Sequence, residues 1–269
     1  SSERGFVMIE KMSFVTLAGP KNEIDYLVTH YLSKHDIHLE NALAEFSSSD
    51  QFTTYNEENP FKDALNKSHE LMGLVKNPEK VKIENISIKS AEGFIDKIDD
   101  RLSDIEDEIS KLNTQIQALD ADFNSLAPFK GLNYTLKGIY DMDFFKYRFG
   151  KIPKVNFDKF ESYLDPDINA IFITTLAATE YVYGVFFAPN EYFEEVAKDF
   201  KNINFDEIAI AKKYKDFPDK ECENILSQKE DLQKQVQAKE DSINDVIEES
   251  KTKLVSAIRR IETAYSNFD

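Results

Sequence analysis

The chain has a single cysteine, Cys222, and none of the short motifs that commonly hold nucleotides or catalytic metals. One cysteine excludes an internal disulfide framework and fits a reducing compartment. The sequence contains no GxxxxGKS phosphate loop, no GxGxxG fingerprint, no CxxC and no HExxH. It therefore predicts neither a glycine-rich phosphate site nor a zinc site of the common spacings.

Positive charge is also scarce, because 33 Lys and Arg face 50 Asp and Glu, for a net charge of −17. An acidic surface argues against nucleic-acid binding, which needs a basic footprint, and disfavours direct docking on anionic lipid. It suits partners with basic faces, although a solvated helical rod explains most of the acidity without any partner.

The longest apolar run, 170–189, is about as long as a bilayer span. Its sequence nevertheless favours part of a soluble domain over a membrane helix. Glu180 would lie near its middle, where a charge is costly, and the flanks are charged. The run is rich in β-branched and aromatic residues and breaks at Leu176–Thr179, which predicts two buried strands joined by a tight turn. Ser1 to Val7 lack the apolar core of a signal peptide, and Met8 is taken as the natural start.

Candidate catalytic residues are few, and no catalytic, cofactor-binding or metal site is predicted. His30, His35 and His38 cluster in sequence, but a turn at Lys34–Asp36 would separate their faces, so surface histidines are expected. The carboxylate pairs Asp99-Asp100 and Glu106-Asp107 fall on solvent faces of a predicted helix, where no pocket shifts their pKa values. Cys222 stands near a helix start, where the dipole could lower its pKa, but a packed, inert thiol is the expectation.

Two stretches of apolar residues repeat in steps of three and four, which is typical of the seam of a left-handed coiled coil. Lys229, Lys239 and Ser250 fall on or near the second seam, and its frame slips around Val246 and Ile247, which locally unwinds a coiled coil. We expect an antiparallel hairpin, a strut rather than an enzyme. The first seam comprises Ile95, Ile98, Leu102, Ile105, Ile109, Leu112, Ile116, Leu119, Phe123 and Leu126; the second comprises Ile225, Leu232, Val236, Ile243, Val246, Ile247, Leu254, Ile258 and Ile261.

Serine and proline residues mark the expected ends of the two helices. Ser87 or Ser90 is placed to cap the first helix and Pro128 to stop it, and Pro218 is placed to start the return helix, which runs to about Tyr265.

The N-terminal part predicts the beginning of a β-α-β unit. The pattern gives a strand at 12–18, a helix at 21–33 and a second strand at 37–43, followed by a polar loop at 47–59. Pro60 then opens a helix through Val75, whose inward residues would be Phe61, Leu65, Met72 and Val75. Residues 80–88 alternate weakly and are either a strand or an extended linker.

Between the two long helices, the order of predicted elements is β-α-β-β-α-β, the ferredoxin-like pattern. The strands are placed at 143–150, 168–176, 180–188 and 205–211, and the helices at 156–164 and 190–200, with Asn156 and Asn190 as their N-caps. The predicted fold class is α+β: an antiparallel coiled-coil hairpin with a ferredoxin-like distal lobe and a partial α/β proximal lobe. Its domains are 8–88, 89–127, 128–214 and 216–267.

Several short segments, in this order, resemble subunit I of archaeal and bacterial V-type ATPases, the counterpart of vacuolar subunit a. The first is MIEKMSFVTLAGPK at 8–21, followed by a helix and IHLEN at 37–41. Asn59-Pro60-Phe61 opens the next helix, the coiled-coil hairpin follows, and FGKIP at 149–153 looks like the family's "G.IP" signature. By architecture the resemblance covers nearly the whole chain.

The resemblance implies a stator component: two α/β lobes on a helical hairpin, at the cytoplasmic face of the membrane. Its implied partners are the peripheral-stalk E–G heterodimers, the C component of the central stalk (vacuolar d) and, through a membrane domain, the proteolipid ring. The chain departs from the family by stopping at Asp269, before any membrane helix, so we expect a soluble piece of a longer integral membrane protein with no ion-translocation residue.

The implied role is mechanical: the domain would hold the membrane sector against the torque of ATP-driven rotation, during transport of protons or sodium. Two other classes stay open. An unrelated coiled-coil scaffold or adaptor, such as a chromosome-organising arm, would need a nucleotide-binding head that this chain does not encode. An enzyme built on the ferredoxin-like insert would need convergent polar residues, whereas residues 143–211 are chiefly core-forming.

Overall fold

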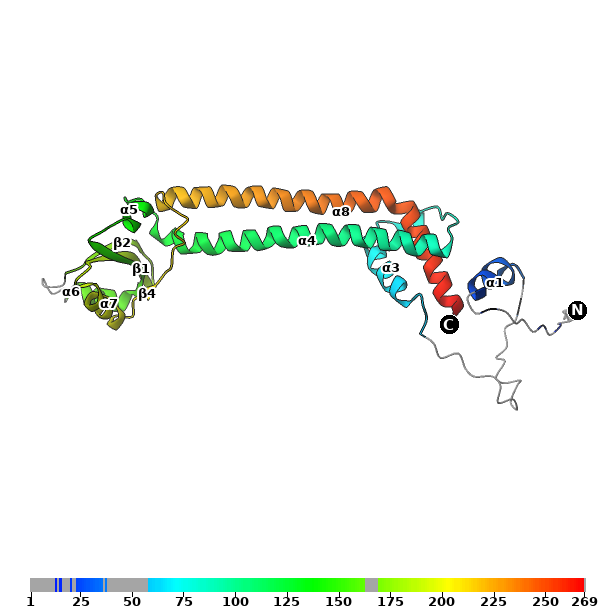
Figure 1. Cartoon of the computed structure of the whole chain (residues 1–269), viewed down its shortest axis with the longest axis horizontal. Helices are drawn as coiled ribbons and strands as arrows, with labels where there is room; N and C mark the ends of the chain where they lie inside the picture. Colours follow the sequence, from blue (N-terminus) through cyan, green and yellow to red (C-terminus); the bar gives the residue numbers. More distant parts are fainter. Residues whose placement is uncertain are drawn as a thin grey trace, which may run out of the picture. The chain divides into compact units, whose positions relative to one another are not determined.

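The structure is a computed structural model that describes residues 13, 15, 20, 23–35, 37, 58–162 and 169–268 (Figure 1). The predicted strands at 12–18 and 37–43, the loop at 47–59 and His38 lie wholly or almost wholly outside these residues. The chain divides into two compact units. Ser1–Leu102 with Asn244–Asp269 form unit 1, and Ser103–Ile243 form unit 2.

Over the residues that the structure describes, the fold combines helices with a four-stranded antiparallel sheet, which confirms the α+β class. Two long helices, α4 (Ile88–Leu126) and α8 (Pro218–Phe268), begin and end close to the predicted residues. The Ser87 hydroxyl accepts a hydrogen bond from the N–H of Ser90, 3.3 Å away, and so caps α4. Within the described parts of the chain, no helix combines the length and the apolar character that crossing a membrane needs.

Among the described residues of unit 1, two short helices accompany the ends of α4 and α8. The first, α1 (Ile24–His30), is shorter than the predicted helix and passes into a 3-10 turn at Leu32–Lys34. The second, α3 (Lys62–Leu74), follows Pro60 as expected, and another 3-10 turn lies at Pro78–Lys80. Leu71 and Val75 are buried, whereas Phe61, Leu65 and Met72 are half-buried.

Polar contacts tie α3 and the following segment to the long helices of unit 1. Lys67 reaches Asp96 at 2.7 Å and Asp99 at 3.2 Å on α4. The N–H of Glu84 donates to the hydroxyl of Ser256 on α8, 2.9 Å away. Residues 81–87 form no strand, so the extended-linker alternative holds there.

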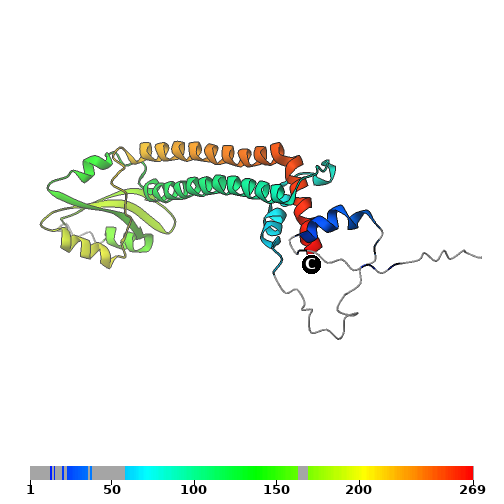
Figure 2. The same ribbon diagram turned by 45° about the vertical axis from the view of Figure 1, so that its right-hand side comes forward.

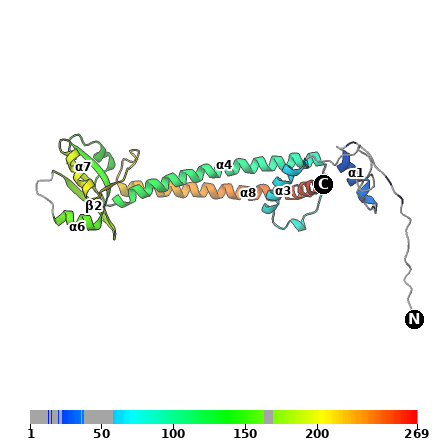
Figure 3. The same ribbon diagram turned by 90° about the horizontal axis from the view of Figure 1, so that it is seen from below.

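In unit 2, α4 and α8 run side by side and antiparallel, as all three views show (Figures 1, 2 and 3). Lys229 pairs with Asp120 at 2.5 Å, and Lys239 pairs with Glu108. The lysine that comes later on α8 thus pairs with the acidic residue that comes earlier on α4, which fixes the antiparallel direction. Seam residues of this stretch are half-buried, because among the described elements each long helix packs there only against the other.

The sheet of unit 2 follows the predicted order of elements, β1-α6-β2-β3-α7-β4. The strands lie in the order β2-β3-β1-β4, with antiparallel pairing throughout. The strands are β1 (Phe145–Pro153), β2 (Ile171–Ala177), β3 (Tyr181–Pro189) and β4 (Asp206–Glu207); the helices are α6 (Lys154–Ser162) and α7 (Phe193–Asn202).

Both faces of this sheet are packed. Phe149, Val185 and Phe187 point to one face, where they meet Leu126, the short helix α5 (Leu136–Tyr140) and the start of α8. Ile152 and Phe186 point to the other face, against Phe193, Val196 and Phe200 of α7. Successive side chains of a strand point to opposite faces of the sheet, so the same strands contribute apolar residues to both cores.

Three details of the prediction were wrong. Asn156 lies inside α6 and its amide donates to the carbonyl of Ile203, 3.1 Å away, so it is no N-cap. Asn190 precedes α7 by three residues, and Tyr192 occupies the cap position. The last strand has two residues rather than seven, because pairing with β1 involves only Asp206 and Glu207.

Candidate functional site

The residues singled out as possible catalytic groups are dispersed. His30 and His35 are exposed, and the ring of His30 contacts the carbonyl of Tyr26 at 3.2 Å. Asp99 pairs with Lys67, while Asp100, Glu106 and Asp107 are exposed on α4. Over the described residues, no group of three or more His, Cys, Asp or Glu side chains is arranged to hold a metal ion.

Cys222 lies in the core rather than at an accessible helix end. It is fully buried among the apolar residues that join the long helices to the sheet. Burial raises the pKa of its thiol, which is the opposite of what an activated cysteine needs. The packed-thiol interpretation is confirmed.

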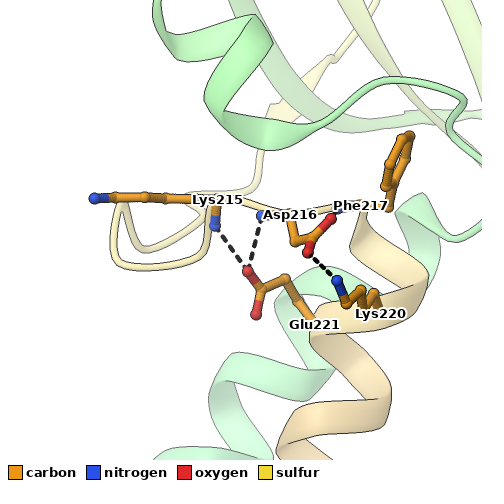
Figure 4. Close-up of polar contacts among 5 residues, drawn as sticks. All are labelled: Lys215, Asp216, Phe217, Lys220 and Glu221. Atoms are coloured by element: carbon orange, nitrogen blue, oxygen red, sulfur yellow. Dashed lines mark hydrogen bonds and ion pairs between the residues drawn. The ribbon is translucent and has the colours of Figure 1, made fainter.

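In unit 2, networks of hydrogen bonds and ion pairs are found instead where the sheet is attached to the long helices. Figure 4 shows the start of α8, where one oxygen of Glu221 accepts hydrogen bonds from the N–H groups of Lys215 and Asp216, at 2.8 and 2.9 Å. Asp216 accepts from the N–H of Phe217 and pairs with Lys220 at 2.6 Å. These side chains satisfy backbone donors at the helix start and fix the direction from which the chain enters it.

The same entry segment is bonded to the segment that leaves α4. The N–H groups of Leu136 and Lys137 donate to the carbonyls of Asp216 and Lys215, at 3.1 and 2.9 Å. Asp219 accepts from the N–H of Gly131 at 2.8 Å. The two segments that connect the helices to the sheet are therefore held to each other rather than acting as free linkers.

A third contact ties the linker before α8 to α4. The carboxylate of Asp122 accepts from the hydroxyl of Tyr214 and pairs with Lys213, both at 2.6 Å. Burial opposes the charge, but these two hydrogen bonds outweigh burial and lower the pKa of Asp122 below its usual 3.8. Burial, followed by the hydrogen bond to Asp122, raises the pKa of Tyr214.

We expect Asp122→Asn to destabilise unit 2 at neutral pH by about 1–2 kcal/mol, since a charged hydrogen bond is replaced by a weaker one. The folded pKa lies below 3.8, so the carboxylate stabilises at neutral pH and this contribution is lost as the pH falls through the folded value. Urea unfolding at several pH values checks this. A gap between the two proteins that persists undiminished in acid would contradict the assignment.

No family model and no curated protein matches this chain. Among solved structures, the chain is similar to the cytoplasmic N-terminal domain of subunit I, a homologue of subunit a, of V-ATPase. The TM-score is 0.50 and the sequence identity 11%, over 93% of this chain and 85% of the other. At this identity the likeness shows the fold alone.

The segment that resembles the family's "G.IP" signature lies in β1, and close packing around its glycine, Gly150, leaves no room for a side chain. Gly150 is paired with Gly184 across β1 and β3. A Cβ atom on Gly150 would meet the carbonyl of Asp206 and the ring of Phe205, and one on Gly184 would meet the carbonyl of Ile173 and the ring of Phe172. Aromatic rings thus cover both glycines, and a side chain at either position would displace them.

Lys229 and Lys239, predicted to fall on or near the seam of α8, are half-buried there. Their side chains turn to acidic residues on α4, Asp120 and Glu108, and so join the two helices at two levels. Polar residues at seam positions cost stability but favour one register of the helix pair.

Replacing both lysines, as Lys229→Leu/Lys239→Leu, should raise the thermal stability of the helix pair by about 0.5–1 kcal/mol per site, because apolar side chains then fill the seam. Circular dichroism during heating measures the change. Lys234→Leu is the matched control, since Lys234 is exposed and pairs with Glu230 of the same helix. Destabilisation by the seam variant alone would show that the ion pairs outweigh apolar packing.

Sequence analysis missed the Asp122, Lys213 and Tyr214 cluster. Tyr214 and Asp122 are 92 residues apart in the chain, so no local sequence pattern contains both partners of this bond. It also missed the partners of Lys229 and Lys239, although it identified both positions.

Proposed function

We propose that this chain is the cytoplasmic stator domain of a rotary V-type ATPase, a non-catalytic part that anchors peripheral stalks at the cytoplasmic face of the membrane. The supporting observation is the extent of the structural likeness: 93% of this chain and 85% of a subunit I domain correspond. A shared pair of long helices alone would not reach that coverage, because more than half of this chain lies outside α4 and α8.

In this proposal, α4 and α8 form a coiled-coil hairpin and the sheet of unit 2 is its ferredoxin-like distal lobe, with unit 1 as the proximal lobe. Rotation of a central stalk puts a reaction torque on the stator. Load applied to the lobe passes into the helices through the core around Phe129 and through the bonded entry segment beside Glu221. Junctions with paired backbone groups resist such a load better than free linkers.

The proposed partners are the peripheral-stalk E–G heterodimers, with the C component of the central stalk near the proximal lobe. The net charge of −17 suits partners with basic faces. The transported ion is a proton or sodium in this proposal.

Isothermal titration of the full 269-residue chain with purified peripheral-stalk heterodimer, at low and moderate salt, tests the proposal. We expect saturable binding that weakens as salt rises, because exposed charges are screened. Absence of binding at both salt concentrations would contradict the anchoring role.

A further inference from the structure

The two edges of the sheet of unit 2 differ in how they are protected from pairing with another strand. At one edge, β4 consists of Asp206 and Glu207, whose carboxylates pair with Lys151 at 3.5 Å and with Arg148 at 3.0 Å. Short strands and charged side chains are the usual devices that keep an edge from adding a strand. The β4 edge is therefore protected.

The opposite edge, β2, has the composition of a strand that accepts a partner. Its sequence, IFITTLA, contains no charged residue, no proline and no glycine. Isoleucine, phenylalanine and threonine are among the residues that favour strands. Ile171 is 61% exposed and Leu176 is 44% exposed, so large apolar side chains reach solvent along this strand. A strand of this kind at the edge of a sheet is a template for pairing with another chain.

Within the described part of the chain, the backbone of β2 has hydrogen-bond partners on one side only. β2 pairs with β3 from Ile171 to Ala177, with an irregularity between Thr174 and Leu176. In an antiparallel ladder, the backbone groups of alternate residues point away from the paired strand. Over the described residues, no further backbone hydrogen bond involves Ile171–Thr174. This regular stretch therefore offers N–H and C=O groups that an added strand can bond.

We propose that β2 pairs with β2 of a second copy of this chain, antiparallel and about a two-fold axis, so that the two sheets join into one. The strand is complementary to itself, because no antiparallel register within β2 places like charges opposite each other, and pairs of aromatic and β-branched residues stabilise a sheet. The two-fold contact uses both β2 edges and leaves a protected β4 edge at each end of the joined sheet. Association therefore stops at a dimer.

The net charge of the chain sets how this pairing responds to salt. Each copy carries −17, so two copies repel each other, although β2 itself is uncharged. Added salt screens the repulsion, so dimerisation should strengthen as salt rises. Binding to a basic partner changes in the opposite direction, which distinguishes the two associations. The inference does not rest on the proposed function, and its failure would leave that proposal standing.

Analytical ultracentrifugation of the full 269-residue chain, from about 2 to about 200 µM, tests the pairing. We expect a reversible monomer–dimer equilibrium with a Kd on the order of 10–100 µM in moderate salt, because the regular edge is short and buries little area. Hydrogen exchange at both ends of this concentration range locates the contact, since amides of Ile171–Thr174 should exchange more slowly in the dimer. A chain that stays monomeric at moderate and high salt would overturn the proposal and favour a foreign strand as the occupant of this edge.

A charge on the pairing edge separates this contact from others. Ile171→Lys should weaken dimerisation at least about tenfold, because a lysine on an edge strand opposes pairing. Leu226→Lys is the matched control: Leu226 is 48% exposed on α8, and its replacement makes the same change of charge. We expect the control to dimerise like wild type within about twofold, and circular dichroism verifies that both variants keep the wild-type helix content. A dimer that Ile171→Lys leaves as stable as wild type would show that the copies meet elsewhere.

Discussion

Phe129→Ala should lower the free energy of unfolding of unit 2 by about 3–5 kcal/mol, the usual cost of deleting a buried aromatic side chain. Phe129 is fully buried immediately after α4, and its ring lies edge-on to that of Phe149 in β1, with centroids 5.0 Å apart. Leu126 and Ile225 complete the same core from the two long helices. One side chain thus contacts both the helices and the sheet.

Urea unfolding of the full chain, followed by far-UV and near-UV circular dichroism, measures this loss. Phe217→Ala is the matched control, because Phe217 directly precedes α8 and the residue is 43% exposed (Figure 4). We expect the control to change stability by less than about 0.5 kcal/mol. Equal losses in the two variants would mean that the helices and the sheet are not joined through the Phe129 core.

Gly184→Ala should destabilise the sheet of unit 2 by about 1–3 kcal/mol through overpacking. A Cβ atom there would lie 2.6 Å from the ring of Phe172 and closer still to the carbonyl of Ile173. The ring belongs to a stack with Phe200, which itself stacks on Phe186 at 4.2 Å, so it has little room to move. The backbone carbonyl is held in the β2–β3 ladder and moves less readily still.

Gly93→Ala is the control for the glycine prediction. A Cβ atom on Gly93 would meet nothing within 4 Å, and the residue lies inside α4. Alanine there should stabilise the chain by up to about 1 kcal/mol, through helix propensity. The two glycine variants should therefore shift the urea midpoint in opposite directions. A Gly184→Ala protein as stable as wild type would show that the sheet relaxes around the new methyl group.

Elements with strong periodicity could be predicted from the sequence. The apolar seams predicted both α4 and α8, because apolar residues in steps of three and four lie on one face of a helix. Pro128 and Pro218 marked the ends correctly, since proline disrupts a helix interior but suits its first turn.

Local signals failed where a tertiary contact competed for the same side chain. Asn156 and Asn190 have good N-cap chemistry, yet their amides bond the carbonyls of Ile203 and Asp143. Each of these contacts spans 47 residues, so no local window contains both partners. The start of the first strand was also misplaced: it was predicted at residue 143, whereas β1 begins at Phe145 and the preceding Phe144 is exposed.

Cross-linking mass spectrometry of the ATPase purified from its native membranes tests most directly the proposal that this chain anchors the peripheral stalks of a rotary ATPase. Lys137 of α5 and Lys146 of β1 are suitable reporters because both are exposed. The account predicts that the chain copurifies with the catalytic head and that these lysines cross-link to peripheral-stalk subunits. An assembled ATPase that lacks this chain, or that shows no cross-link between it and the stalks, would contradict the account.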